Sequence, residues 1–515
     1  MSSPFYITTP IYYVTDAPHI GHLYTTVAGD IQARYHRLLG DDVWFLTGTD
    51  EHGQKIEKKA RETKETPQQL ADRVVERYRT AWTRYGITYD DFIRTTEERH
   101  KKTVQEFVAQ LMKTGDIYLD AYEGWYCVPD ETYWTETQVV DGKCPDCGRS
   151  VEKLKEESYF FKMSAYQEKL LAHIKNNPDF IFPESRKNEV LGFIQQGLKD
   201  ISISRTTIQW GIAMPGDPKA TKEHKIYVWF DALTNYISAL GYSKKDPKYS
   251  KYWPEAIHLV GKDILRFHAI YWPTFLMALG LPLPKKIVAH GWLTDANRKI
   301  SKSLGNVIDP MQLAEEVGVD GMRFFLFREF AFGLDGEYTK DVMYQRINSD
   351  LANDYGNCIN RLCAMTQKYL GEKELDVADI LTSESTLHQT ALEAVPLMHK
   401  ELQGFSYHRA LDQIWRLVGG VNRFIETNAP WTLARSSIEA DQKKLKLVLV
   451  HCHESLRIAS LCLLPFVPTM AEKALQYLGD KEKPAMNRAE WGKGPKKITI
   501  TKGDPLYPRL EMKET

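Results

Sequence analysis

The sequence predicts an α/β domain that is interrupted by an inserted subdomain and followed by an all-α bundle. Three observations lead to this fold class. Short β-rich runs alternate with longer amphipathic stretches in the first part, which is typical of a parallel sheet. The apolar periodicity weakens between about residues 116 and 225, and a helical pattern takes over after about residue 345. A chain of 515 residues also exceeds one hydrophobic core and corresponds to about three domains.

The chain begins with a predicted strand–helix–strand unit. Phe5–Thr9 has the pattern of a buried strand, and Asp42–Thr47 has the same pattern. Between them, Val27, Ile31 and Tyr35 recur at helical spacing. Two strands joined by a helix in this way predict a parallel sheet.

Later segments complete the predicted fold. The α/β pattern is expected to resume with strands at Ile226–Phe230, Ala256–Gly261 and Lys286–His290. Apolar residues of Leu411–Ile425 then share one helical face, and Leu445–Leu464 shows a similar spacing. These long periodic segments predict a helical bundle.

Composition and charge exclude several classes of protein. Apolar residues make up 43% of the chain and charged residues 26%, which is typical of packed globular domains. The net charge of −1 means that a polyanion must be bound by a local patch or by backbone amides. Because the sequence has no apolar stretch of about 20 residues and no signal peptide pattern, we expect no membrane partner. Seven sparse cysteines indicate a reducing, cytoplasmic setting.

One candidate phosphate site lies where the first strand turns into the first helix. The sequence there is Pro18-His19-Ile20-Gly21-His22. A helix N-terminus offers backbone amides and a partial positive charge to phosphate. The two imidazoles can donate hydrogen bonds to phosphate oxygens, and Gly21 lets a flat ring approach the backbone. Taken alone, the pattern fits two surface histidines equally well.

A second candidate segment, Arg298–Asn306, follows a predicted strand and a polar turn. It is rich in Ser and Gly and carries Lys299 and Lys302. Such a cationic loop is suited to closing over a triphosphate, and a solvated surface loop is the alternative interpretation.

Together the two segments resemble the paired HIGH and KMSKS motifs of class I aminoacyl-tRNA synthetases, with Ile300 at the usual Met position. Further blocks are similar to the methionyl-tRNA synthetase family and extend the resemblance over nearly the whole chain. These blocks are Ile11–Tyr13, Thr47–Gly53, Val228–Tyr236, Gly261–His268, Asn357–Arg361 and Ala429–Trp431. The resemblance implies ATP-dependent ligation of L-methionine to tRNA(Met) through methionyl-adenylate, for translation initiation and elongation.

The resemblance also implies a role for each predicted domain. Residues 1–115 and 226–295 are expected to be the two halves of a Rossmann-like catalytic domain, which residues 116–225 split as a connective insertion with a zinc knuckle. Residues 296–345 carry the KMSKS-type loop and a region that contacts the tRNA stem. Residues 346–485 are expected to form the α-helical anticodon-binding domain. A C-terminal strand within Lys496–Thr501 and a tail occupy residues 486–515.

Nucleotide-binding residues follow from the same resemblance. His19, His22, Lys299 and Lys302 are expected to be catalytic, because they stabilise charge on the phosphates. The expected ATP-binding set is His19, Gly21, His22, Asp263, Lys299, Ser301, Lys302 and Ser303. Asp263 would hold the ribose hydroxyls, and Mg2+ would accompany ATP. The reaction needs no protein nucleophile, since the methionine carboxylate and the tRNA hydroxyl are the attacking groups.

A methionine pocket is implied at the carboxyl ends of the strands. Asp50 would pair with the substrate ammonium, because a carboxylate at the end of a strand faces the ligand crevice of an open sheet. The residues expected to line the side-chain pocket are Ile11, Tyr13, Trp229, Ala232, Tyr236, Ile264 and His268. Aromatic walls suit a polarizable thioether. Each of these aromatics, taken singly, also fits an ordinary core position.

The insertion contains a candidate metal knuckle. Cys144 and Cys147 form its second half, and Cys127 precedes it, with Asp130 where the family usually has a second Cys. Because zinc accepts three thiolates and a carboxylate oxygen, a structural zinc site is expected. A degenerate knuckle without metal is the alternative.

Three residues of the helical part are assigned to the CAU anticodon by the resemblance. Asn357 and Arg361 are four residues apart and share a helix face, and Trp431 follows Pro430 at a helix end. Such side chains can read unpaired bases by hydrogen bonding and stacking. Without the resemblance, Trp431 would be interpreted as a core residue.

Other functions fit the sequence less well. Leucine, isoleucine and valine enzymes of the class are far longer in the insertion, and a cysteine enzyme needs a zinc ligand set that is scattered along the chain. A small-molecule nucleotidyltransferase shares the His-x-Gly-His pattern but does not explain the helical domain, and a non-catalytic tRNA-binding paralogue does not explain the histidines and lysines. We expect no DNA partner, and a monomer, since the dimerisation domain of some relatives is not appended.

Overall fold

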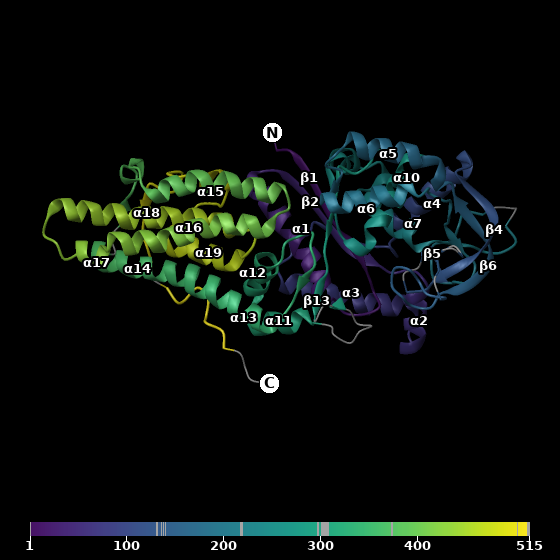
Figure 1. Ribbon diagram of the computed structural model, residues 1–515, viewed down its shortest axis with the longest axis horizontal. Coiled ribbons are helices and arrows are strands. Elements are labelled where there is room, and N and C mark those ends of the chain that lie inside the picture. Colours follow the sequence, from purple (N-terminus) through teal and green to yellow (C-terminus); the bar gives the residue numbers. More distant parts are fainter. Residues whose placement is uncertain are drawn as a thin grey trace. The chain divides into compact units, whose positions relative to one another are not determined.

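The computed structural model describes residues 2–129, 132–134, 136, 138–139, 141–216, 220–295, 298–299, 308–371, 374–501 and 503–511. The chain divides into two compact units. One contains Ser3–Pro18 and Val43–His290 and is called the sheet unit, and the other contains His19–Asp42 and Gly291–Thr515 and is called the helical unit. Figure 1 labels many of the elements of both units.

A six-stranded sheet forms the centre of the sheet unit, with the strand order β3-β2-β1-β11-β12-β7. The pairs β2–β3, β1–β11, β11–β12 and β12–β7 are parallel. The strands are β1 (Pro4–Tyr13), β2 (Asp42–Asp50), β3 (Asp91–Arg94), β7 (Ile181–Phe182), β11 (Ala256–Gly261) and β12 (Lys286–His290). The predicted strands near residues 5, 42, 256 and 286 are therefore confirmed, and β7 comes from within the range assigned to the insertion.

The helices of this unit are α2 (Gln54–Thr63), α3 (Pro67–Arg84), α4 (Glu98–Thr114), α5 (Gln167–Asn176), α6 (Glu184–Gln195), α7 (Val228–Leu233), α8 (Asn235–Ser238), α9 (Pro247–Tyr252) and α10 (Trp272–Leu279). Local chemistry sets their ends. Thr66 caps α3 by accepting from the Gln69 amide, and the Gln69 side chain accepts from the Thr66 amide in return. Pro67 occupies the first helical position, where its missing N–H costs nothing.

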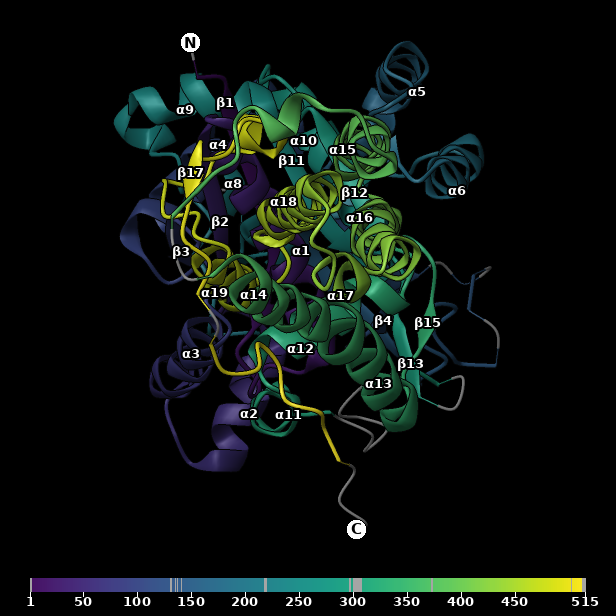
Figure 2. The same ribbon diagram turned by 90° about the vertical axis from the view of Figure 1, so that its left-hand side faces the viewer.

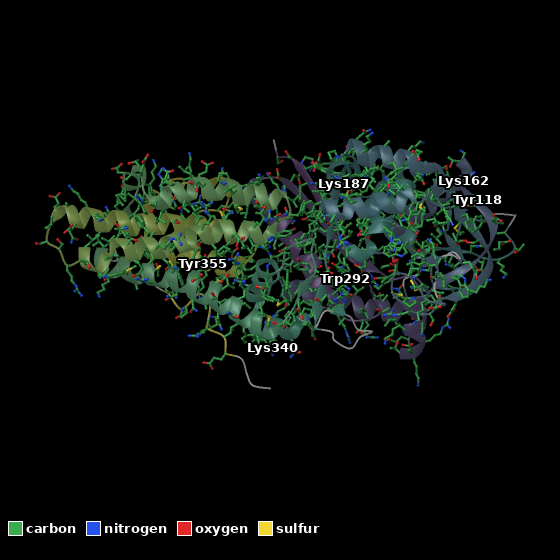
Figure 3. All side chains as sticks on the ribbon, in the orientation of Figure 1. Tyr118, Lys162, Lys187, Trp292, Lys340 and Tyr355 are labelled. Carbon is green, nitrogen blue, oxygen red and sulfur yellow. The ribbon has the colours of Figure 1, made fainter. Side chains whose placement is uncertain are left out.

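An antiparallel sheet, ordered β5-β4-β6-β8, lies within the insertion. Its strands are β4 (Ile117–Cys127), β5 (Thr132–Trp134), β6 (Glu152–Phe161) and β8 (Ile201–Ser202). The long β4–β6 ladder begins with the pair Ile117 and Phe161. The hydroxyl of Tyr118 donates to Asp200, and the Lys162 ammonium lies 5.6 Å from the Tyr118 ring centroid; both side chains are labelled in Figure 3.

The predicted strand Ile226–Phe230 is wrong. Only Lys225–Ile226, as β10, pairs with β9 (Ser204–Arg205), and the chain then turns into the short helix α7. The Asp231 amide donates to the Tyr227 carbonyl at 3.1 Å, which closes the first helical turn. A short apolar run of aromatic and β-branched residues fits a buried strand and a buried helix equally well by periodicity, so the sequence pattern could not separate them.

The helical unit consists mainly of packed helices, and Figure 2 shows α15, α16 and α18 as neighbouring coils. Its helices are α1 (Ile20–Leu39), α11 (Pro310–Val317), α12 (Val319–Glu329), α13 (Lys340–Arg346), α14 (Asn357–Leu370), α15 (Thr386–Gln403), α16 (Tyr407–Asn428), α17 (Pro430–Leu433), α18 (Glu439–Leu463) and α19 (Pro468–Tyr477). Inside it, the Tyr355 hydroxyl, labelled in Figure 3, lies 2.7 Å from Ser460 Oγ. The predicted bundle is confirmed.

Two short sheets complete this unit. One has the order β14-β13-β15, with β13 (Leu293–Asp295), β14 (Arg298–Lys299) and β15 (Gly336–Glu337). The other pairs β16 (Leu375–Asp376) with β17 (Lys497–Ile498), which is shorter than the predicted strand at Lys496–Thr501. Among the helices that the structure describes, none has the length and apolar character that a membrane span requires.

Helix α1 is embedded in the helical unit although it follows the first strand in sequence. The Tyr407 hydroxyl donates to the Ala28 carbonyl at 3.1 Å, and the Gln32 amide group donates to the Leu402 carbonyl at 2.8 Å. Both of these hydrogen bonds are buried. The Asp30 carboxylate lies 2.8 Å from Nη2 of Arg323, and both side chains are fully buried. Polar residues of α1 are therefore paired with residues of the later helices.

Candidate active site, metal knuckle and RNA-binding face

The first turn of α1 is closed by two histidines that cap each other. His19 is the N-cap residue, and its Nδ1 accepts a hydrogen bond from the Gly21 amide at 3.0 Å. In return, Nδ1 of His22 accepts from the His19 amide at 3.2 Å. The two half-buried rings stack with their centroids 3.7 Å apart. This reciprocal cap has the geometry of a capping box, built here from imidazoles.

The cap fixes the protonation of both rings. A ring nitrogen that accepts a hydrogen bond carries no proton, so the proton of each neutral imidazole sits on Nε2. Gly21 is required for this arrangement, because a Cβ at that position would lie 2.9 Å from His19 Cε1. In the structure, the ring of His19 lies close to the Gly21 backbone.

The second predicted phosphate-binding segment is only partly described. Lys299 lies at the end of β14, and its side chain together with Ser301, Lys302 and Ser303 lies outside the described residues. The chain is described again from Ile308, whose carbonyl accepts a hydrogen bond from the Ile20 amide at 3.2 Å. At Ile308, the chain that follows this segment is therefore joined to the first turn of α1, within the same unit.

In the sheet unit, the predicted ligand groups gather at the carboxyl ends of adjacent strands. Chain order reverses between β1 and β11, which makes this point the switch point of the sheet. Asp50 ends β2 and is 3% exposed. Asp263 follows β11 and is exposed, and its carboxylate folds back over Gly261, where a Cβ would lie 2.5 Å from Asp263 Oδ1. Ligand crevices of open α/β sheets lie at this edge.

The aromatic residues predicted for the methionine pocket come together in the same unit. The Tyr236 hydroxyl lies 2.7 Å from Nε2 of His268, whose Nδ1 lies 2.9 Å from the Ile264 carbonyl. A carbonyl only accepts, so His268 donates from Nδ1 and accepts at Nε2 from the tyrosine. Burial lowers the pKa of His268 to about 4, against the opposing effects of the Ile264 carbonyl and the Asp263 charge. The imidazole is therefore neutral at physiological pH.

The remaining predicted pocket residues surround this pair. Trp229 stacks on Phe267 with centroids 3.8 Å apart, and its ring centroid lies 6.3 Å from that of His268. Ala232 and Tyr236 are buried, whereas Ile11, Tyr13, Trp229 and Ile264 are partly buried and pack against the same core.

Two features of the sheet unit were not predicted from the sequence. His52 and His100 both bond to the buried carboxylate of Asp231 at 2.7 Å. In addition, Arg205 lines a cavity of about 150 Å³, with its guanidinium 5.2 Å from the Tyr126 ring and 4.6 Å from the Tyr227 ring. A buried guanidinium is a good partner for carboxylate or phosphate. Neither feature leaves a local sequence signal, because its members are far apart in the chain.

The cysteine knuckle has metal-binding geometry. The sulfur atoms of Cys127, Cys144 and Cys147 all lie within 4.8 Å of one another, and those of Cys127 and Cys147 are 3.5 Å apart. Tetrahedral zinc with thiolates at about 2.3 Å places sulfurs about 3.8 Å apart, so the three thiols fit. The predicted fourth ligand, Asp130, lies outside the described residues.

The predicted RNA-reading residues lie in the helical unit. The Arg361 guanidinium is 5.6 Å from the Trp431 ring centroid, and its Nη2 pairs with the Glu426 carboxylate at 2.6 Å. Asn357 is exposed one helical turn earlier on α14. The structure thus brings Arg361 and Trp431 together. Trp431 lies in the first turn of α17, which begins at Pro430.

Sequence comparison assigns the chain to a family. A family model described as "tRNA synthetases class I (M)" matches residues 5–153 and 149–363. Methionine–tRNA ligase of Bacillus subtilis is 48% identical over 100% of this chain and 79% of the relative. The corresponding ligase of Thermotoga maritima is 45% identical over 99% of this chain and 81% of the relative. The chain belongs to the class I methionyl-tRNA synthetases.

Solved structures of this family agree with the fold. Methionyl-tRNA synthetase of Mycobacterium tuberculosis in complex with methionyl-adenylate matches with a TM-score of 0.91 and 41% identity, covering 98% of this chain and 100% of that chain. The apo form of the same enzyme matches with a TM-score of 0.85 and 38% identity, over 100% and 99% of the two chains. The predicted Rossmann-like domain followed by a helical domain is confirmed.

Proposed function

We propose that this chain activates L-methionine with ATP as methionyl-adenylate and transfers the methionyl group to tRNA(Met), with the residue roles given below. The observation that carries these roles is the reciprocal cap of His19 and His22. It aligns two neutral imidazoles at a helix N-terminus with each proton on Nε2, as a site for developing phosphate charge requires.

In the first step, the methionine carboxylate attacks the α-phosphate of ATP and pyrophosphate leaves. His19 and His22 donate from Nε2 to phosphate oxygens as negative charge builds, while Lys299 and Lys302 hold the triphosphate with Ser301 and Ser303. The bond between Ile20 and Ile308 supports this assignment, since it holds the chain two residues after the lysine segment at the helix start. Mg2+ that accompanies ATP would supply further charge neutralisation. Asp263 accepts from the ribose hydroxyls.

Methionine is recognised by charge at one end and by shape at the other. Asp50 pairs with the ammonium group. Neutral His268 and Tyr236 present a polar pair beside the apolar wall of Trp229 and Ala232, which suits a thioether because sulfur interacts well with aromatic rings. In the second step, the terminal ribose hydroxyl of the tRNA attacks the activated carbonyl and AMP leaves.

The knuckle would hold one structural zinc ion through Cys127, Cys144 and Cys147, with Asp130 as the fourth ligand. Three thiolates at this spacing support that assignment. Bound zinc would cross-link the insertion, so the ligands act on folding rather than on the reacting atoms.

In the helical unit, Asn357, Arg361 and Trp431 would read the CAU anticodon. The proximity of the Arg361 guanidinium and the Trp431 ring supports a stacking site, on which an unpaired base can lie. Replacing Trp431 with Ala would then weaken aminoacylation without affecting adenylate formation. We place the reaction in the cytoplasm, with the chain acting as a monomer.

ATP–pyrophosphate exchange with each of the twenty amino acids tests the activity and its substrate together. Methionine-dependent exchange alone is the expected result. Exchange with cysteine instead would overturn the substrate, and the absence of exchange with any amino acid would favour a tRNA-binding protein without catalysis. Aminoacylation of tRNA(Met) against a tRNA with an altered anticodon then tests the roles of Asn357, Arg361 and Trp431.

A further inference from the structure

The carboxylate of Asp231 connects three elements of the sheet unit. Its Oδ2 lies 2.7 Å from Nδ1 of His52, which follows β2, and its Oδ1 lies 2.7 Å from Nε2 of His100 on α4. Nδ1 of His100 lies 2.8 Å from Oγ of Ser238 on α8. Asp231, His100 and Ser238 are at most 1% exposed, and His52 is 4% exposed. The result is a chain of buried hydrogen bonds from His52 to Ser238.

Three of the elements that these hydrogen bonds connect, the end of β2, α7 and α8, also carry residues of the proposed methionine pocket. Asp50 lies two residues before His52, at the end of β2. Trp229 and Ala232 lie on α7 on either side of Asp231, and Tyr236 lies on α8 with Ser238. The hydrogen bonds therefore join the element that would bind the ammonium group to the elements that would hold the side chain.

Charge makes these connections strong and directional. Burial alone would raise the pKa of Asp231, but the two histidines more than offset this and hold the pKa at about 2. The carboxylate is therefore ionised, and hydrogen bonds to an ionised buried group are short and about twice as strong as neutral ones. Because both oxygens are used, the carboxyl plane is fixed, and with it the rotation of the short helix α7.

We propose that Asp231, His52 and His100 are positioning residues for methionine, which hold Asp50 and the Trp229–Ala232 wall at the separation that the substrate spans. This proposal rests on the pocket assigned under the proposed function. The three residues act through Asp50 and α7 and do not touch the substrate. Their removal should therefore affect methionine binding selectively, because a misplacement of about 1 Å in a pocket costs up to about 10²-fold.

The test compares substitutions that remove a hydrogen bond with substitutions that keep it. In His52→Asn, the side-chain amide nitrogen replaces Nδ1, and in His100→Gln it replaces Nε2, so both variants retain the donor to Asp231. His52→Ala and His100→Ala remove it. We expect the Ala variants to raise the KM for methionine in ATP–pyrophosphate exchange about 10- to 100-fold, with kcat and the KM for ATP near wild-type values. The Asn and Gln variants should restore most of the methionine KM.

Asp231→Asn is the third variant, because it keeps the shape of the side chain and removes its charge. We expect a similar rise in the methionine KM and a matching loss of methionine affinity in calorimetric titration without ATP. Should Asp231→Asn fail to fold, the paired histidine variants decide the question. Asp41→Asn is the matched control: its carboxylate also lies 2.7 Å from a histidine Nδ1, that of His36, but in the helical unit. Its methionine KM should remain at the wild-type value.

Failure of the positioning role can be distinguished from failure of the proposed pocket. A purely structural role predicts that folded His52→Ala and His100→Ala have a lower melting temperature but a wild-type methionine KM, and this result would overturn the proposal. If Asp50→Asn also leaves the methionine KM unchanged, the pocket assignment itself is wrong. If Asp50→Asn raises the KM and the Asp231 and histidine variants do not, only the positioning role is refuted.

Discussion

His19 performs two tasks in the structure that a single substitution can separate. Its Nδ1 caps α1 by accepting from the Gly21 amide, and its Nε2 carries the proton that the proposed mechanism donates to phosphate. In His19→Asn, the side-chain oxygen takes over the cap, because Asn is among the best N-cap residues, but the Nε2 donor is lost. We therefore expect the free energy of unfolding to stay within about 0.5 kcal/mol of wild type.

The expected effect on the reaction is much larger. Removing one preorganised donor from a site of developing negative charge costs about 10²–10³-fold in rate, or about 2.7–4 kcal/mol of transition-state stabilisation. His19→Asn should slow methionine-dependent ATP–pyrophosphate exchange by this factor. His19→Ala should slow exchange equally and also lose about 1 kcal/mol of stability, because the cap is removed as well.

Exchange rates at saturating substrates and chemical denaturation curves measure the two effects independently. Gly192→Ala is the control, since a Cβ at this exposed position of α6 meets no atom within 4 Å. It should exchange at the wild-type rate. The assignment of the two tasks is refuted if His19→Asn exchanges like wild type, or if it is destabilised as much as His19→Ala.

Three further predictions concern burial, charge and metal. As the pH falls from 6.5 to about 4, His268 becomes protonated in the unfolded chain but stays neutral in the folded protein, where it is buried. This difference should lower the free energy of unfolding by about 3 kcal/mol over that interval. Denaturation curves of wild type and His268→Gln should diverge accordingly, and parallel curves would contradict the assignment. Asp30→Asn should cost about 3–5 kcal/mol in thermal or chemical unfolding, because it leaves Arg323 buried without its carboxylate; a cost below about 1 kcal/mol would show that the pair is unimportant. Purified protein should contain one zinc ion per chain by mass spectrometry, and Cys144→Ser should bind zinc about 10- to 100-fold more weakly; wild-type protein that takes up no zinc when its thiols are reduced would exclude the site.

The sequence predicted those parts of the fold that local patterns determine. The strands at the β1, β2, β11 and β12 positions are short apolar runs between polar turns, and the bundle helices have long periodic faces. The prediction at Ile226–Phe230 was wrong because a short, mostly buried apolar run has no alternation that separates a strand from the helix α7, which begins at Val228.

The placement of α1 was beyond the reach of such patterns. Asp30 and Gln32 interrupt its apolar sequence, and their partners, Arg323 and Leu402, lie about three hundred residues or more later in the chain. The same holds for Asp231, whose partners His52 and His100 are 179 and 131 residues away. Polar groups that are satisfied only by tertiary contacts give no periodic signal, so the structure is needed to find them.

For the candidate site residues, the sequence predicted which side chains take part, and the structure shows which of them contact one another. His19 and His22 were expected to present donors, but their mutual cap, which sets the tautomers, depends on backbone angles. Tyr236 and His268 were predicted as pocket residues, and the structure adds their hydrogen bond and the burial that keeps the imidazole neutral. The roles assigned to these residues remain predictions, as do those of Lys299 and Lys302.

The burial of α1 among later helices has a consequence for how the gene product can be divided. A recombinant fragment that stops near residue 300 would contain every strand of the large sheet, yet the Ala28 carbonyl and the side chains of Gln32 and Tyr35 would lose their hydrogen-bond partners on α15 and α16. Such a fragment should be prone to aggregation, and so should a helical fragment that lacks residues 19–42. During translation, α1 can therefore reach its native packing only after most of the polypeptide has been synthesised.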